Sequence, residues 1–199
     1  MSEHYYSARP TTAHQETTFT ATLRGMAFTF HTDAAVFSRN RIDFGSTLLI
    51  EVMQLDPAAT VLDLGCGYGP IGMVAARLAP RGRIYMVDVN ERATQLALRN
   101  LKANGITNAE VRTGNALEPV SGLSFDAVLT NPPFRAGKAV VYAMVDGAHS
   151  VLKPGGSLWV VIQTKQGAPS MKKKLQEVFG NVEDVDRKAG YHVFRAVKG

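Results

Sequence analysis

The chain has 199 residues, 45% of them hydrophobic, and a single cysteine, Cys66. This length suits one domain with a full apolar core, and a single cysteine excludes an intrachain disulfide and a multi-cysteine metal site. The first residues lack the pattern of a signal peptide, and no apolar run approaches the about 18 residues of a membrane span. We therefore expect a soluble cytoplasmic protein without metal, and its net charge of +5 is compatible with a polyanionic partner such as RNA.

The N-terminal part of the chain predicts an arm followed by a β-hairpin. Residues 1–16 are polar and rich in threonine, which indicates a flexible arm, whereas residues 17–199 are expected to form one domain. Apolar and polar residues alternate over 17–23 and again over 27–31, with Arg24-Gly25 between the two runs, a pattern typical of a hairpin. A helical pattern then begins at Asp43.

From residue 60 the chain alternates between short apolar runs and helical patterns. Strands are predicted over 61–64, 83–89, 109–113, 125–130 and 157–163, and helices over 70–79, 91–104, 138–152 and 170–179. Lys153-Pro154-Gly155-Gly156 is expected to break the chain after the third of these helices. Two last strands, over 181–186 and 191–197, are joined by Ala189-Gly190. The alternation predicts an α/β fold, a doubly wound and mostly parallel sheet with an antiparallel last strand.

A glycine-rich turn follows the first strand of the sheet, in Asp63-Leu64-Gly65-Cys66-Gly67-Tyr68-Gly69. Glycines permit positive φ angles and close approach of a ligand to the backbone, and the following helix offers its N-terminal amides. A dinucleotide motif would need glycine where Pro70 stands, so a pyrophosphate-binding loop is disfavoured. The alternative is a purely structural turn, and Cys66 in this turn is expected to be a small buried side chain rather than a nucleophile.

Two polar residues end the next strands. Asp88 could accept hydrogen bonds from the ribose hydroxyls of an adenosine, or it could cap the following helix, a role that Asn90 could also fill. Asn115 could pair with the edge of an adenine or serve as a turn residue.

The most informative segment is Asn131-Pro132-Pro133-Phe134, which ends the fourth strand of the sheet. Prolines fix φ and exclude the preceding residue from the helical region, so a rigid extended platform is expected here. The Asn131 side-chain oxygen and the Pro132 carbonyl would each accept one N–H of an NH₂ group, and Phe134 would stack on a planar substrate. A proline-rich exit from a strand is the structural alternative.

Together these residues resemble class I methyltransferases that use S-adenosylmethionine (SAM), in particular the catalytic half of bacterial 16S ribosomal RNA guanine N2-methyltransferases. The resemblance covers residues 17–199 and implies a sheet of seven strands. It extends to the segment of Phe37 and to Asp43-Phe44-Gly45-Ser46, which helps to cover the cofactor in that family. It implies cofactor contacts from Asp63, Gly65, Cys66, Gly67, Gly69, Asp88, Val89, Asn115, Ala116 and Asn131, with Phe37, Gly45 and Ser46 completing the site.

The resemblance implies catalysis by Asn131, Pro132, Pro133 and Phe134 and a partner that is ribosomal RNA or a ribosomal particle. Arg135 and Lys138 flank this motif and are expected to grip phosphates near the base, on which Phe134 would stack. Arg135 stands where that family often has histidine, and its second domain is missing here, so adenine N6 and a protein glutamine amide stay open as targets. An oxidoreductase that uses a nicotinamide cofactor, or a non-catalytic module that binds SAM or RNA, is the alternative from another class. The sequence leaves the oligomeric state open, a monomer included.

Overall fold

The computed structural model describes residues 16–33 and 41–199. The predicted arm, apart from Glu16, and the predicted cofactor residue Phe37 lie outside these described residues. Within them, no helix is long and apolar enough to cross a membrane.

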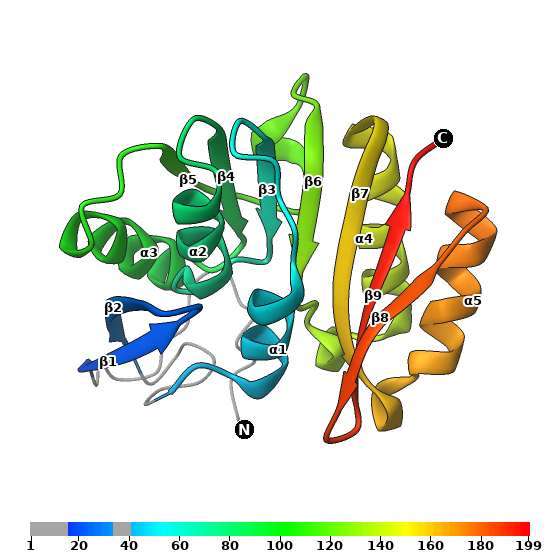
Figure 1. Cartoon of the computed structure of the whole chain (residues 1–199), viewed down its shortest axis with the longest axis horizontal. Coiled ribbons are helices and arrows are strands. Elements are labelled where there is room, and N and C mark those ends of the chain that lie inside the picture. Colours follow the sequence, from blue (N-terminus) through cyan, green and yellow to red (C-terminus); the bar gives the residue numbers. More distant parts are fainter. Residues whose placement is uncertain (1–15, 34–40) are drawn as a thin grey trace.

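Seven strands form one sheet in the order β5-β4-β3-β6-β7-β9-β8 (Figure 1). The strands are β3 (Thr60–Leu64), β4 (Arg83–Asp88), β5 (Ala109–Thr113), β6 (Phe125–Thr130), β7 (Leu152–Gln163), β8 (Glu183–Lys188) and β9 (Tyr191–Val197). The first five are parallel, and β9 runs antiparallel to both β7 and β8. The predicted doubly wound sheet with an antiparallel last strand is therefore confirmed.

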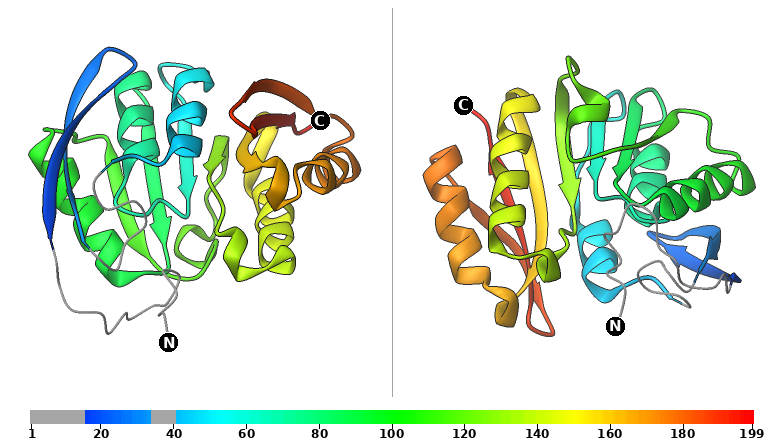
Figure 2. Two further views of the ribbon diagram at one scale, coloured as in Figure 1. Left: turned by 90° about the horizontal axis from the view of Figure 1, so that it is seen from below. Right: turned by 180° about the vertical axis from the view of Figure 1, so that it is seen from behind.

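Helices cover both faces of this sheet (Figure 2). They are α1 (Phe44–Val52), α2 (Pro70–Leu78), α3 (Glu91–Ala103), α4 (Lys138–Val151) and α5 (Ala168–Phe179). Side chains of β7 alternate between two apolar cores: Trp159 and Val161 join α1, α2 and α3, whereas Leu158 and Val160 join α4 and α5. Because successive side chains of a strand point to opposite faces, this apolar run is buried on both sides.

Several predicted boundaries were wrong near glycine-rich segments. Strand β7 begins at Leu152 rather than Ser157, because the expected breaker pairs with the end of the chain: Gly155 N–H donates to the Lys198 carbonyl at 2.7 Å. The strand predicted over 181–186 lies at 183–188, directly before the turn at Ala189 (φ 50°) and Gly190 (φ 77°). Helix α5 begins at Ala168 instead of residue 170.

The N-terminal hairpin, β1 (Thr17–Leu23) and β2 (Met26–Thr32), is confirmed as a separate two-stranded sheet. It is fastened to α3 by two asparagine side chains. Asn100 accepts from His31 N–H at 2.7 Å and donates to the His31 carbonyl at 3.0 Å, and Asn104 makes the same pair of contacts with Thr29. The Asn100 amide also donates to the Tyr68 carbonyl at 2.9 Å. The fully buried Asn100 thus joins the hairpin to the glycine turn.

Asp63 is a fully buried carboxyl group in the middle of the parallel sheet. Its Oδ2 accepts the Gly72 N–H of α2 at 2.8 Å, and its Oδ1 has no hydrogen-bond partner among the described residues. Burial is the main cause that raises the pKa of Asp63 to about 7, since the low dielectric of the core disfavours the charged form. Asp63 therefore holds α2 against β3, and its carboxyl group is mostly protonated below about pH 7.

We predict that Asn100→Ala lowers the free energy of unfolding by about 3 kcal/mol. The substitution leaves the His31 N–H, the His31 carbonyl and the Tyr68 carbonyl without their partner, at about 1–3 kcal/mol for each unsatisfied buried group. Urea unfolding measures the change. Gln95→Ala, at an exposed position of the same helix, is the control and should change the free energy by less than about 0.5 kcal/mol. Equal losses in the two variants would contradict the fastening role.

A second prediction concerns pH. The folded protein keeps the Asp63 proton up to about pH 7, whereas the unfolded chain releases it near pH 4, so this group makes the protein less stable as pH rises between these values. Asp63→Asn removes that contribution. Urea unfolding at pH 5 and pH 8 should show the variant gaining stability over wild type with rising pH, by about 2.5 kcal/mol between these two pH values. Parallel pH profiles would show that Asp63 does not titrate in this range.

Candidate active site

The glycine turn and the Asn-Pro-Pro-Phe segment lie side by side at one edge of the sheet. The turn follows β3 and the segment follows β6, and these two strands pair in parallel. Their ends are joined directly, because the buried Thr130 hydroxyl donates to the Leu64 carbonyl at 2.7 Å. The chain runs from β3 toward β5 on one side and from β6 toward β7 on the other, so this edge is the topological switch point where ligands bind in such sheets.

The backbone of the glycine turn is hydrogen-bonded to the neighbouring strand, β4. The N–H groups of Gly65 and Cys66 both donate to the Val87 carbonyl of β4, at 2.8 and 2.9 Å. Gly69 (φ 105°) precedes the first residue of α2, and a Cβ atom there would lie 2.7 Å from the Met86 Cε. Only glycine fits this position, where the left-handed backbone and the close packing of α2 on β4 occur together.

Asp88 lies at the end of β4 and is hydrogen-bonded to the glycine turn. Its Oδ2 accepts the Gly67 N–H at 2.8 Å and its Oδ1 accepts the Asn90 N–H at 2.9 Å. The cap of α3 is supplied by Asn90, whose side chain accepts from Arg92 and Ala93. Asp88 is therefore not the helix cap.

Cys66 is buried and its Sγ lies 3.5 Å from the Gly67 carbonyl. Burial raises the pKa of the thiol well above its ordinary value, with the nearby Asp88 and Asp63 adding to the shift. A thiol that stays protonated is a weak nucleophile, so the expectation of a small buried side chain is confirmed.

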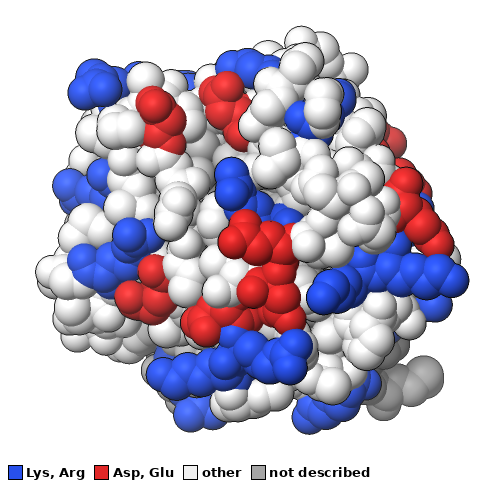
Figure 3. All heavy atoms as spheres, turned by 45° about the vertical axis from the view of Figure 1, so that its right-hand side comes forward, with Lys and Arg blue, Asp and Glu red and all other residues white. Residues whose placement is uncertain are grey.

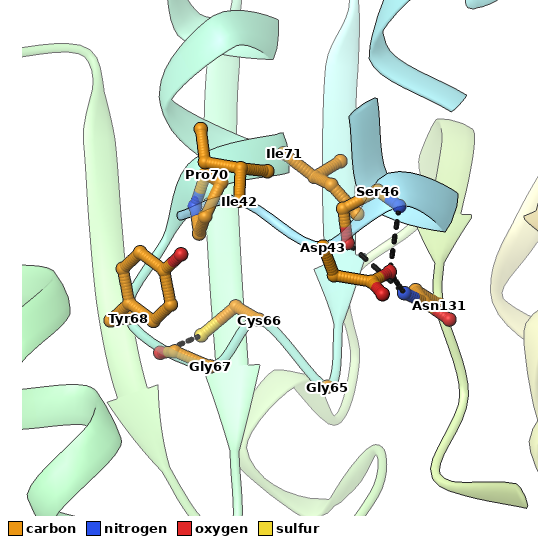
Figure 4. A pocket seen from close by; sticks show the side chains of 10 residues that line it. All are labelled: Ile42, Asp43, Ser46, Gly65, Cys66, Gly67, Tyr68, Pro70, Ile71 and Asn131. Atoms are coloured by element: carbon orange, nitrogen blue, oxygen red, sulfur yellow. Dashed lines mark hydrogen bonds between the residues drawn. The ribbon is translucent and has the colours of Figure 1, made fainter. Parts of the chain in front are cut away.

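The Asn131 side chain is clamped by residues at the start of α1 (Figure 4). Its amide nitrogen donates to Asp43 Oδ2 at 2.8 Å and to Ser46 Oγ at 3.0 Å. The same Asp43 oxygen accepts the Ser46 N–H at 3.0 Å and caps α1. Both amide hydrogens are thus engaged, and the carboxylate can only accept, so the orientation of the carboxamide is determined. The Asn131 Oδ1 has no donor among the described residues.

The residues after Asn131 differ from the expected extended platform. The Phe134 N–H donates to the Pro132 carbonyl at 2.9 Å across Pro133 (φ −76°, ψ 80°), which is an inverse γ-turn. A 3₁₀ turn follows over Phe134–Ala136 and leads into α4. The Pro132 carbonyl, predicted as a substrate acceptor, therefore already accepts one backbone hydrogen bond and keeps one lone pair.

A cavity of about 40 Å³ lies between α1, the glycine turn and Asn131. Its lining includes the predicted residues Ser46, Gly65, Cys66, Gly67 and Asn131, and adds Ile42, Asp43, Tyr68, Pro70 and Ile71. Among the described residues, Asp43 is the one charged side chain in this lining. The carboxylate of Asp43 favours a positively charged ligand here.

Other predicted cofactor residues lie outside this lining. Gly45 packs on Tyr191 of β9, whose ring would lie 2.9 Å from a Cβ atom at that position. Asn115 is exposed after β5, beside Ala116 (φ 48°), and Val89 is half-buried after β4. These last residues follow β4 and β5, on the side of β3 where Asp88 lies.

Two residues that line the site, Asp43 and Tyr68, belong to segments singled out from the sequence but had no role of their own there. Asp43 could have been recognised as a helix cap, because aspartate directly before a helical pattern is a common N-cap, but its contact with Asn131 joins residues 88 positions apart. Tyr68 carries no motif of its own, yet its buried ring packs edge-on against Phe30 and Phe19 of the hairpin. In the part of the chain that the structure describes, no group of three His, Cys, Asp or Glu side chains could hold a metal ion.

Known proteins resemble both the sequence and this geometry. The protein YbxB of Bacillus subtilis is 46% identical over the whole of both chains. Ribosomal RNA large subunit methyltransferase G of Streptomyces avermitilis is 36% identical over 88% of this chain and 46% of its own length. The T. thermophilus 16S rRNA N2 methyltransferase RsmC, in complex with AdoMet and guanosine, superposes with a TM-score of 0.84 at 30% identity, over 96% of this chain and 52% of that one.

The chain thus spans about half the length of these two ribosomal RNA methyltransferases and the full length of YbxB. The family model of the methyltransferase small domain matches residues 27–195, which include the glycine turn, Asp88 and the Asn-Pro-Pro-Phe segment. The sheet order, the paired ends of β3 and β6 and this match agree with one another. The chain belongs to the methyltransferase small domain family.

Proposed function

We propose that the protein transfers a methyl group from SAM to an exocyclic amine of an RNA base, with guanine N2 in ribosomal RNA as the target. One observation carries this proposal: Asp43 and Ser46 take up both amide hydrogens of Asn131 and leave its oxygen as an acceptor beside the glycine turn. The choice of RNA and of guanine rests on the relatives, since one is a large subunit methyltransferase and the other was solved with guanosine.

The residues of the first cavity fit the methionine end of SAM. SAM supplies an activated methyl group on a positively charged sulfur. Asp43 would offset this charge, and the backbone of Gly65 and Gly67 would contact the ligand without side chains in the way. The about 40 Å³ of the cavity accommodates only part of the ligand, so the adenosine would extend past Asp88 toward Asn115 at the ends of β4 and β5.

Asn131 would act on the substrate amine. The nitrogen of an aromatic NH₂ group gives its lone pair to the ring and is a poor nucleophile. An oxygen that accepts one N–H holds the nitrogen in place and favours a pyramidal geometry, with the lone pair directed at the methyl group. The remaining lone pair of the Pro132 carbonyl is available for the second N–H. Because the Asn131 oxygen is oriented in advance, the enzyme need not reorganise during the transfer.

We predict that Asn131→Ala lowers kcat by about 100-fold or more, the scale of one lost preorganised contact to a transition state. Single-turnover transfer of labelled methyl from SAM to ribosomal RNA of a strain lacking this protein measures the effect. Titration calorimetry should show SAM affinity within a few-fold of wild type. Full activity of the variant would rule out the assigned role, and label found only in protein would rule out RNA as the substrate.

We predict that Asp43→Ala lowers kcat about 10-fold, since an amide held by Ser46 alone can rotate. The lost helix cap should also lower the free energy of unfolding by about 1 kcal/mol. Asp43→Asn is the matched variant, because one amide oxygen can accept from both Ser46 and Asn131, and it should restore kcat to within about threefold. If Asp43→Asn is as slow as Asp43→Ala, the charge of Asp43 matters and its hydrogen bond to Asn131 does not.

A further inference from the structure

A second cavity, of about 110 Å³, opens directly behind the Asn-Pro-Pro-Phe segment. It lies between the first turns of α4 and α5, over the core that those helices share, and it has no lining residue in common with the first cavity. Phe134 connects the two sites, because it lines the second cavity and follows Asn131 by three residues. The contacts proposed above for SAM and for the methylated amine lie outside this space, although Phe134 and Lys138 were expected from the sequence to bind the substrate.

The walls of the second cavity suit a flat aromatic ring with polar edges. Its floor is apolar and buried, with Val141, Ile162 and Met171, and the half-buried rings of Phe134 and Tyr142 stand at its sides. The exposed side chains of Lys138, Gln166 and Ser170 form the rim. At about 110 Å³ the cavity is smaller than the closed apolar cavity of about 150 Å³ that holds benzene, so a ring inserted here would leave one edge at the open rim. Aromatic and apolar walls below a polar rim are typical of sites that hold a nucleobase.

The charge at the rim favours a phosphate beside that ring. Lys138 Nζ lies 5.0 Å from the centroid of the Tyr142 ring and, among the described residues, pairs with no carboxylate. Lys174 Nζ lies 5.5 Å from the same ring but is neutralised by Asp146 at 2.6 Å. Basic and acidic side chains are interspersed over the face of the molecule that Figure 3 shows.

A ring in this cavity would not contact the Asn131 oxygen that the proposed function assigns to the methylated amine. Asn131 lines the first cavity, whereas Asn131, Pro132 and Pro133 are all absent from the lining of the second. We propose that the second cavity holds the base of the nucleotide next to the methylated one, with Lys138 on a phosphate that joins or flanks the two. This inference rests on the proposed function, because it assumes an RNA strand whose target base reaches Asn131.

A large side chain introduced at the rim should fill the cavity and exclude the base. Ser170 is exposed on α5, and its contact with the Tyr142 hydroxyl is made by its backbone carbonyl, so Ser170→Trp keeps that bond. With ribosomal RNA of a strain lacking this protein as substrate, the variant should raise KM about 10-fold or more and leave kcat within about twofold.

Lys138→Gln should raise KM and lower the slope of log affinity against log salt by about 0.7, the effect of one phosphate contact on a single strand. Lys172→Gln, an exposed lysine of α5 outside the cavity, is the control and should change neither.

The outcomes separate this inference from the proposed function. Unchanged KM in Ser170→Trp, or a fall in kcat without a rise in KM, would overturn the neighbouring-base site. Should Ser170→Trp prove unfolded by thermal melting, the salt slope of Lys138→Gln relative to Lys172→Gln decides instead. Photocrosslinking of RNA containing 4-thiouridine should mark the peptide with residues 166–171 in wild type, and its absence there would also overturn the site. A wild-type protein that crosslinks at this peptide but methylates no RNA would contradict the proposed function and leave the base-binding site standing.

Discussion

The hydrogen bonds from the Asn131 amide to Asp43 and Ser46 are the constraint on which the site depends. They join the start of α1, which precedes the sheet in the chain, to the end of β6 in its middle. The Thr130 hydroxyl ties the same strand end to the glycine turn. Three segments far apart in sequence are therefore fixed against one another before any ligand arrives, which is what preorganised catalysis requires. Asn100 extends the fixed region to the hairpin through the Tyr68 carbonyl.

Local patterns were sufficient to predict most of the fold. Apolar runs buried on both faces, alternating with amphipathic helices, indicate a parallel sheet, and the positive φ angles of Arg24 and Gly25 agree with the predicted hairpin turn. The glycine turn and Asn131 were expected to lie close together on the grounds of topology alone, because both follow parallel strands at the same edge of the sheet. Boundaries failed at Leu152 and near Ala189, where long-range pairing extends or shifts strands beyond the glycines that appear to end them.

Contacts between distant side chains were beyond the sequence. Nothing local marks Asp43 as the partner of Asn131, or Asn100 as the partner of a hairpin backbone almost 70 residues away. The inverse γ-turn at Pro133 was missed because proline fixes its own φ but leaves ψ to its surroundings. The second cavity arises where α4 and α5 meet, and apart from Phe134 none of its residues belongs to a motif. Burial of Asp63 shows the same limit, since its raised pKa depends on the completed core.

A crystal structure of the protein with S-adenosylhomocysteine and guanosine would test the central claim most directly. The account predicts the exocyclic nitrogen of guanosine within about 3.2 Å of the Asn131 oxygen, with the Asn131 amide nitrogen still on Asp43 and Ser46. A guanosine bound away from Asn131, or an Asn131 side chain turned so that its nitrogen faces the base, would contradict it.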